Sequence, residues 1–161
     1  MDQKYILSLL VENEPGVLSR ISGLFSGRGY NIESLNVAVT TDPQISRITM
    51  VTRGTPTIVE QIKKQLNKLI NVIKVYDLTG DDYVERELAM IKVRAEDQHR
   101  AEILRMVDIF RCKVVDVSAE SYTIEVTGTA DKLEAILKLL KPMGIKEIAR
   151  TGSLALLRES K

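Results

Sequence analysis

The stretch "NEPGVLSRISGLFSGRGYNIESL", residues 13–35, contains the first corner of the fold. It follows the run "YILSLLV", residues 5–11, which is apolar on both faces and is therefore typical of a buried central strand. After the polar turn Asn-Glu-Pro-Gly, apolar residues recur at helical spacing and form one stripe: Val17, Leu18, Ile21, Leu24 and Phe25. The sequence thus predicts a strand, a tight turn and an amphipathic helix that begins near Pro15 or Gly16.

Further strands and a second helix follow in the first half of the chain. Gly27 and Gly29 end the first helix, because glycine tolerates the left-handed backbone of a C-terminal cap. Residues 31–39 and 46–52 alternate in polarity as strands do, and an Asp-Pro turn separates them. A second helical stripe and a closing strand, residues 71–79, complete this half; the stripe consists of Ile58, Val59, Ile62, Leu66, Leu69 and Ile70.

The second half repeats this order of elements. Its predicted strands and helices are residues 87–93, 99–110, 113–119, 121–129 and 131–140, with a last strand over 145–158. In the first of these helices Ile103, Met106, Val107 and Phe110 share a face. Pro142 and Gly144 end the second helix, and Gly152 interrupts the last strand.

Both halves therefore have the order β-α-β-β-α-β, which is that of the ferredoxin-like split βαβ. The predicted fold class is α+β with two tandem units, residues 1–80 and 81–161, joined by the polar linker 79–86. Two helices should cover one face of a four-stranded antiparallel sheet in each unit. A unit of about 75–80 residues has a small core, so docking or oligomerisation is expected.

Composition argues against several classes of function. A net charge of +1, 4% aromatic residues and the absence of tryptophan argue against a nucleic-acid partner. The single cysteine, Cys112, favours a reducing cytosol, and no apolar segment is long enough to span a membrane. His99 is the only histidine, so a zinc-binding His/Cys cluster is missing. We expect a cytoplasmic protein with no metal site, no catalytic residues and no membrane or nucleic-acid partner.

The turn at residues 13–16 has two interpretations. A capped corner explains Asn13 and Pro15, because asparagine suits the N-cap and proline suits the first helical turn. Gly16 would cost about 0.5–1 kcal/mol inside that turn relative to alanine, yet it would let a ligand carboxylate reach the helix N-terminus. The matching place in the second half, "RAEDQHRAEI" (residues 94–103), lacks asparagine and Pro-Gly. We expect no amino-acid site there, and a helix that begins with Asp97 near its N-cap.

Residues 13–35, with the "SRITM" that follows, resemble the small regulatory subunit of acetohydroxyacid synthase (acetolactate synthase). The N-terminal half of that family is an ACT domain, a ligand-sensing βαββαβ module. "VERELAMIKV" (84–93), "FRCKVVDV" (110–117) and "YTIEVTGT" (122–129) resemble its second domain. The resemblance implies a non-catalytic subunit that activates the catalytic subunit and mediates feedback inhibition by valine in branched-chain amino acid biosynthesis. Thiamine diphosphate, Mg²⁺ and FAD would belong to the catalytic partner, and this chain would hold no cofactor.

The family's effector site lies between two ACT domains of a homodimer. Carried over by position, one chain would contribute Asn13, Gly16, Val17 and Leu18, and the other chain Asn31 and Ile32. Pairing of the second strands across a two-fold axis would form two such pockets. An ACT-type amino-acid sensor that regulates a different enzyme stays an alternative, because a fold alone does not name a partner.

A free-standing enzyme is a further alternative. The carboxylates Asp81, Asp82, Glu85 and Glu87 are close in sequence, but their spacing matches no calcium loop and suits a solvated linker better. Glu33 could be a general base, although its strand places no nucleophile beside it.

Overall fold

The computed structural model describes residues 2–159. The chain divides into two compact units: residues up to Val84 together with those from Gly152 onwards form the first, and Glu85–Thr151 form the second. These limits differ from the predicted 1–80 and 81–161. Strand β5 (Tyr83–Arg94) begins inside the segment predicted to be a linker, and the chain returns to the first unit after Thr151.

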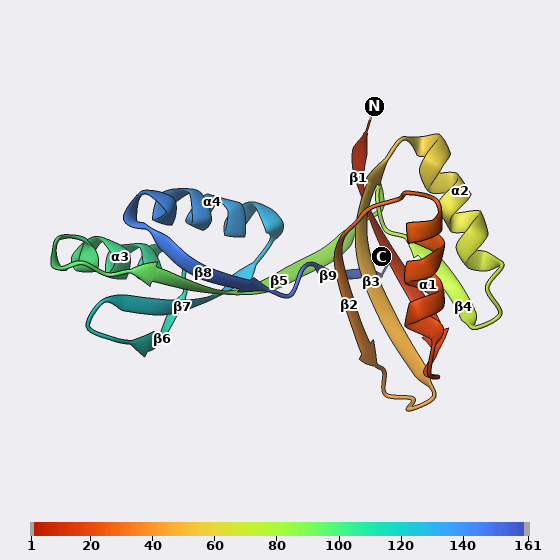
Figure 1. The fold of residues 1–161 in the computed structure, drawn as a ribbon, viewed down its shortest axis with the longest axis horizontal. Helices are drawn as coiled ribbons and strands as arrows, with labels where there is room; N and C mark the ends of the chain where they lie inside the picture. The colour runs from red at the N-terminus through yellow and green to blue at the C-terminus, as the bar shows by residue number, and fades with distance from the viewer. Residues whose placement is uncertain (1, 160–161) are drawn as a thin grey trace. The chain divides into compact units, whose positions relative to one another are not determined.

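The first unit has the predicted βαββαβ order. Its elements are β1 (Gln3–Glu12), α1 (Val17–Gly27), β2 (Ile32–Val39), β3 (Ile45–Gly54), α2 (Pro56–Asn67) and β4 (Val72–Asp77). The strands form an antiparallel sheet in the order β2-β3-β1-β4, so β2 and β4 are its edges within the described residues. Helices α1 and α2 lie on one side of this sheet (Figure 1).

The core of the first unit lies between these helices and the sheet. Four of the five predicted stripe residues of α1 are buried, namely Val17, Ile21, Leu24 and Phe25. Gly29 has the predicted left-handed conformation, with φ of 70°, just after the helix. The prediction for Ile70 is wrong: α2 ends at Asn67, so Ile70 lies in the following turn, where it is 91% exposed.

The opposite face of the first sheet is partly covered by the C-terminal segment. Strand β9 (Leu154–Leu157) pairs with β5, and the amide of Arg158 donates to the carbonyl of Asp82 at 2.9 Å. Ala155 of β9 is buried in an apolar cluster with Ile6, Val51 and Leu78. Because side chains alternate along a strand, Ile6 points away from the helices while its neighbour in β1 points toward them.

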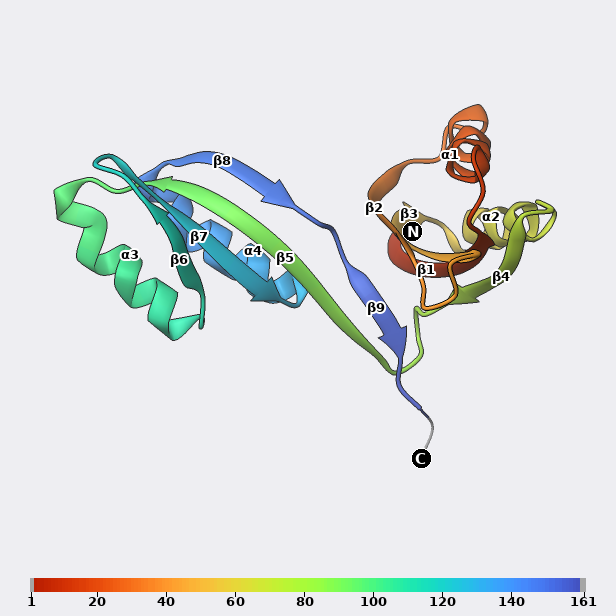
Figure 2. The ribbon, with the colours of Figure 1, turned by 90° about the horizontal axis from the view of Figure 1, so that it is seen from below.

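The second unit repeats the plan. After β5 come α3 (Asp97–Ile109), β6 (Lys113–Val117), β7 (Ser121–Gly128), α4 (Ala130–Leu140), the 3₁₀ turn η1 (Lys141–Met143) and β8 (Ile145–Arg150). The sheet order is β6-β7-β5-β8. Figure 2 shows β8 continuing along the chain into β9. Residues 151–153 between them are not in a strand, so the interruption at Gly152 that the sequence predicted is confirmed. The α+β class with two units is therefore confirmed.

Candidate functional site

The corner between β1 and α1 differs from its prediction in where the helix begins, so Asn13 is not the N-cap. The helix begins at Val17, and Gly16 is its N-cap with φ of 86° and ψ of −8°. Pro15 lies in the turn before the helix, not in its first turn. The left-handed backbone explains the glycine, because other residues adopt this conformation at a cost. The helix-propensity argument for Gly16 is thus replaced by a conformational one.

The N-terminus of α1 is nevertheless open. A Cβ atom built at Gly16 would have no heavy atom of the described residues within 4 Å. No side chain caps the helix, no acidic residue lies in its first turn, and no acceptor in the described chain binds the amides of Leu18 and Ser19. These amides carry the partial positive charge of the helix N-terminus. The corner therefore has the chemistry to receive a small carboxylate.

The other residues of the corner can be placed individually. The amide of Asn13 donates from Nδ2 to the carbonyl of Pro43 at 3.0 Å, which leaves Oδ1 for another donor. The Leu18 side chain is 41% exposed. Val17 is buried in the core, so only its backbone can contact a ligand at this corner.

A hydrogen-bond network of Glu12, Arg20 and Asn71 stabilises the corner, and the sequence analysis did not predict it. Asn71 accepts a hydrogen bond at Oδ1 from Nη1 of Arg20, and its Nδ2 donates to the Glu12 carboxylate at 2.9 Å. The amide of Glu12 donates to the carbonyl of Asn71, also at 2.9 Å. Asn71 thus ties the end of β1 to the second turn of α1. A polar residue between Ile70 and a strand was the only signal for it in the sequence.

Asn31 and Ile32 lie where β2 begins. The carbonyl of Asn31 accepts a hydrogen bond from Oγ1 of Thr52 at 2.7 Å, and Thr52 is fully buried. The Asn31 side chain is exposed, whereas Ile32 packs in part against the core. Thr52, which fixes the backbone of this half of the site, was also missed by the sequence analysis.

The two predicted halves of the site lie at opposite ends of β2. Ile32 pairs with Thr52 at the start of β2, and Val39 pairs with Ser46 at its end. The turn of residues 13–16, which we call the Asn13 corner, adjoins the turn that follows Val39. A strand rises about 3.3 Å per residue, so Ile32 and Val39 are roughly 23 Å apart. One chain therefore cannot place Asn13 and Asn31 around the same small ligand.

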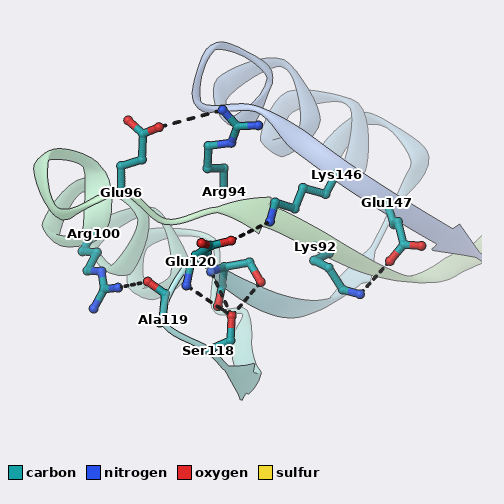
Figure 3. A network of polar contacts seen from close by, with 10 residues as sticks. Lys92, Arg94, Glu96, Arg100, Ser118, Ala119, Glu120, Lys146 and Glu147 are labelled. Atoms are coloured by element: carbon teal, nitrogen blue, oxygen red, sulfur yellow. Dashed lines mark hydrogen bonds and ion pairs between the residues drawn. The ribbon is translucent and has the colours of Figure 1, made fainter.

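The matching corner in the second unit is built differently (Figure 3). Its hollow is lined by charges of both signs, and Arg94 pairs with Glu96 at 3.9 Å while Lys146 pairs with Glu120 at 4.0 Å. As predicted, α3 begins at Asp97, which places a carboxylate in its first turn. Next to this corner, the Lys92–Glu147 hydrogen bond of 2.6 Å lowers the pKa of that carboxyl and raises that of the lysine.

Three of the four carboxylates in residues 81–87 are engaged with separate partners. Asp82 pairs with Arg158 at 3.1 Å, Glu85 accepts the amide of Ala130 at 3.0 Å, and Glu87 pairs with Arg150 at 2.7 Å. Glu33 pairs with Arg53 at 2.6 Å. Among the described residues, no three His, Cys, Asp or Glu side chains converge as a metal site would require. None of the helices described is both long and apolar enough to cross a membrane.

Comparison with known proteins places both units in one family. Residues 7–74 match the family model described as "AHAS small subunit-like ACT domain", and residues 86–159 match "Small subunit of acetolactate synthase". The acetolactate synthase small subunit of Mycolicibacterium smegmatis is 54% identical over 96% of this chain and 91% of its own length. That of Aquifex aeolicus is 53% identical over 98% of this chain and 82% of its own length.

A solved structure agrees with these matches. The crystal structure of the acetolactate synthase small subunit from Thermotoga maritima is 42% identical in sequence, with a TM-score of 0.89 over 99% of both chains. The sequence relatives and the structure thus agree over nearly the whole length, as the resemblance of residues 13–35 indicated. The chain belongs to the family of acetolactate synthase small subunits.

Proposed function

We propose that this chain is the regulatory subunit of acetohydroxyacid synthase, that it activates the catalytic subunit, and that it inhibits it when valine is bound. The chain itself performs no chemistry in this proposal. Thiamine diphosphate, Mg²⁺ and FAD belong to the catalytic partner, which makes acetolactate for branched-chain amino acid biosynthesis. The proposed effector site combines Asn13, Gly16, Val17 and Leu18 of one chain with Asn31 and Ile32 of a second copy.

The observation that carries this proposal is the placement of the two half-sites at opposite ends of an edge strand. In the described sheet, one edge of β2 is bonded to β3 and the other edge is unpaired. Antiparallel pairing of β2 with the β2 of a second copy, about a two-fold axis, would bring the start of one strand beside the end of the other. Each Asn13 corner would then adjoin the partner's Asn31, and two equivalent sites would form.

The chemistry of each half suits a different part of a small amino acid. The amides of Leu18 and Ser19 at the α1 N-terminus would bind the carboxylate, and Oδ1 of Asn13 would accept from the ammonium group. Burial of the isopropyl group would contribute roughly 1.5–2 kcal/mol, and each charged hydrogen bond about 1.5–3 kcal/mol. After the costs of association, an affinity of roughly micromolar to sub-millimolar is expected.

Reconstitution tests this function directly. The chain is mixed with an acetohydroxyacid synthase catalytic subunit, and acetolactate formation is measured with and without the chain and with and without valine. We expect the chain to raise activity and valine to lower it again. If neither addition changes the rate, the proposal fails, and the chain is better viewed as an ACT-type sensor for a different enzyme.

A further inference from the structure

Within the described residues, the chain passes from one unit to the other after Val84 and after Thr151. The second passage leads from β8 into residues 152–157, which we call the strap. The residue before the strap is held firmly, because the amide of Thr151 donates to the carbonyl of Leu88 at 3.0 Å and its Oγ1 accepts the amide of Leu88 at 3.1 Å. The strap is therefore a short covalent continuation of the second unit's sheet into the first unit (Figure 2).

The start of the strap is fitted closely against β2. Gly152 is buried with φ of 78°, and a Cβ atom built on it would lie 2.5 Å from Cβ and 2.9 Å from Oγ of Ser34. Real Cβ atoms do not approach other atoms so closely, so only glycine fits without displacing β2. Next to it, Nδ2 of Asn36 donates to the carbonyl of Ser153 at 3.2 Å, and Ser153 is 3% exposed.

Further along, the strap is anchored to the middle of the sheet. Ala155 is 4% exposed and packs against Ile6 and Val51. The apolar contact holds the strap to β1 and β3, whereas Gly152 and Ser153 contact β2, so movement of β2 relative to the rest of the sheet must change its fit against the strap. Closely packed contacts have few arrangements of similar energy, so they favour a change between two discrete conformations over a continuous deformation.

The contact begins next to one half of the proposed effector site. Asn31 and Ile32 precede an irregularity in the β2–β3 register between Ile32 and Ser34, and Ser34 is the residue that Gly152 touches. Two residues of strand span roughly 7 Å. A bulge permits a local change of twist, so a ligand that draws Asn31 toward a second chain would reorient the adjoining part of β2.

We propose that the strap couples the effector site to the second unit: occupancy at Asn31 and Ile32 changes the fit of Ser34 and Asn36 against Gly152 and Ser153, and thereby the strand β8 that leads into the strap. This inference rests on the proposed function. The effector must have different affinities for the two arrangements of β2, because a ligand that binds both equally shifts neither. The strap supplies the two-state contact that such differential binding can bias.

Gly152→Ala tests the coupling with Gly80→Ala as its control. Gly80 also has a positive φ, of 90°, but a Cβ there would have no described atom within 4 Å, so it reproduces the backbone strain without touching β2. In the reconstituted enzyme we expect Gly152→Ala to reduce the maximal inhibition by valine at least two-fold. The affinity of the free chain for valine, measured by calorimetry, should change less than about three-fold. The control variant should match the wild type in both measurements.

The outcomes separate this inference from the proposed function. Full inhibition in the Gly152→Ala enzyme would overturn the coupling while leaving the effector site intact. If the wild-type chain itself neither binds valine nor responds to it, the proposed function fails first and the coupling fails with it. Loss of valine binding in Gly152→Ala, with normal binding in Gly80→Ala, would also overturn the inference, because the strap would then shape the site instead of relaying its state.

Hydrogen exchange on the full-length chain gives a readout that does not depend on activity. Valine should slow exchange of amides in residues 145–150 and 152–157 as well as in β2. Asn36→Ala removes one hydrogen bond without straining the backbone. In this variant valine should still slow exchange in β2, but at least half of its effect on residues 145–150 and 152–157 should be lost. Protection confined to residues 13–19 and 31–33 of the wild-type chain would contradict the proposal.

Discussion

Replacing Arg150 by alanine is expected to destabilise the second unit strongly, although Arg150 ends the edge strand β8. Its guanidinium donates from Nε to Oε1 of Glu87 at 2.7 Å and from Nη2 to Oε2 at 3.3 Å. The Glu87 side chain is only 4% exposed, whereas that of Arg150 is 34% exposed. The hydrogen bond that Arg150 donates to the Glu87 carboxylate raises the pKa of Arg150, so the pair keeps its positive partner at every pH of interest.

The magnitude follows from what the substitution leaves behind. Removing one partner of a buried ion pair costs about 3–5 kcal/mol, because the remaining charge is buried without compensation. Arg150 is one-third exposed, so water reaches the pair from one side and we expect the lower end, about 3 kcal/mol. The second contact of Arg150, to Glu134 at 3.2 Å, adds little because Glu134 is 66% exposed.

Urea unfolding followed by circular dichroism measures this loss. Arg158→Ala is the matched control, because its pair with Asp82 is 55% and 82% exposed and should contribute less than about 0.5 kcal/mol. The double variant Glu87→Leu/Arg150→Met removes both charges together and should regain most of the stability. A cost below about 1 kcal/mol for Arg150→Ala would refute the reasoning that Glu87 depends on its partner.

Two further substitutions and one chemical modification have defined outcomes. Gly16→Asp should weaken valine binding, measured by calorimetry, at least about 100-fold. The reason is that two carboxylates some 4 Å apart repel by about 4 kcal/mol near a protein surface. The control Gly80→Asp, at a residue with a similar positive φ of 90°, should bind valine normally in the same titration. Asn71→Ala should lower the free energy of unfolding by about 1–3 kcal/mol in urea melts, because Glu12 and Arg20 lose a shared partner that is 7% exposed. Burial raises the pKa of the Cys112 thiol, so its alkylation by iodoacetamide at neutral pH should be slower than that of a model thiol, and equal rates would contradict this.

The sequence was sufficient where the signal is local. The α1 stripe, the left-handed Gly29 after it and the break at Gly152 depend on residues within a turn or two of each other. Their periodicity and glycine placement give the repeated βαββαβ order directly. A local pattern failed at Ile70, which continues the helical spacing but follows the end of α2 at Asn67.

Contacts between distant residues were beyond such reasoning. Glu87 was grouped with the nearby linker carboxylates, yet its partner Arg150 is 63 residues away. Strand β5 also begins earlier than predicted, at Tyr83. Residues 154–157 were predicted to end the second unit, but in the structure they belong to the first. Their sequence pattern alone does not indicate which sheet they cover. The positive φ of Gly16 gives this glycine a backbone role that a strand-to-helix pattern does not reveal.

The residues of the turn at 13–16 left a ligand site as one of two interpretations, and the family resemblance added the contribution of a second chain to the proposed site. Position-by-position transfer named Asn13 and Asn31, but it gave no reason for two chains to be needed. The pairing of Ile32 with Thr52 and of Val39 with Ser46 supplies that reason, because it separates the two half-sites by the length of β2. We therefore expect the effector site to be shared between two copies of this chain.

Mixing two defective variants tests that claim most directly. Gly16→Asp and Asn31→His chains, each inactive in valine binding as homodimers, are unfolded together, refolded and titrated with valine in a calorimeter. In a mixed dimer one site carries both lesions and the other carries neither, so random pairing should restore about a quarter of the wild-type binding capacity. If the mixture binds no valine although mixed dimers have formed, each site is built from one chain, which contradicts a site shared between two copies.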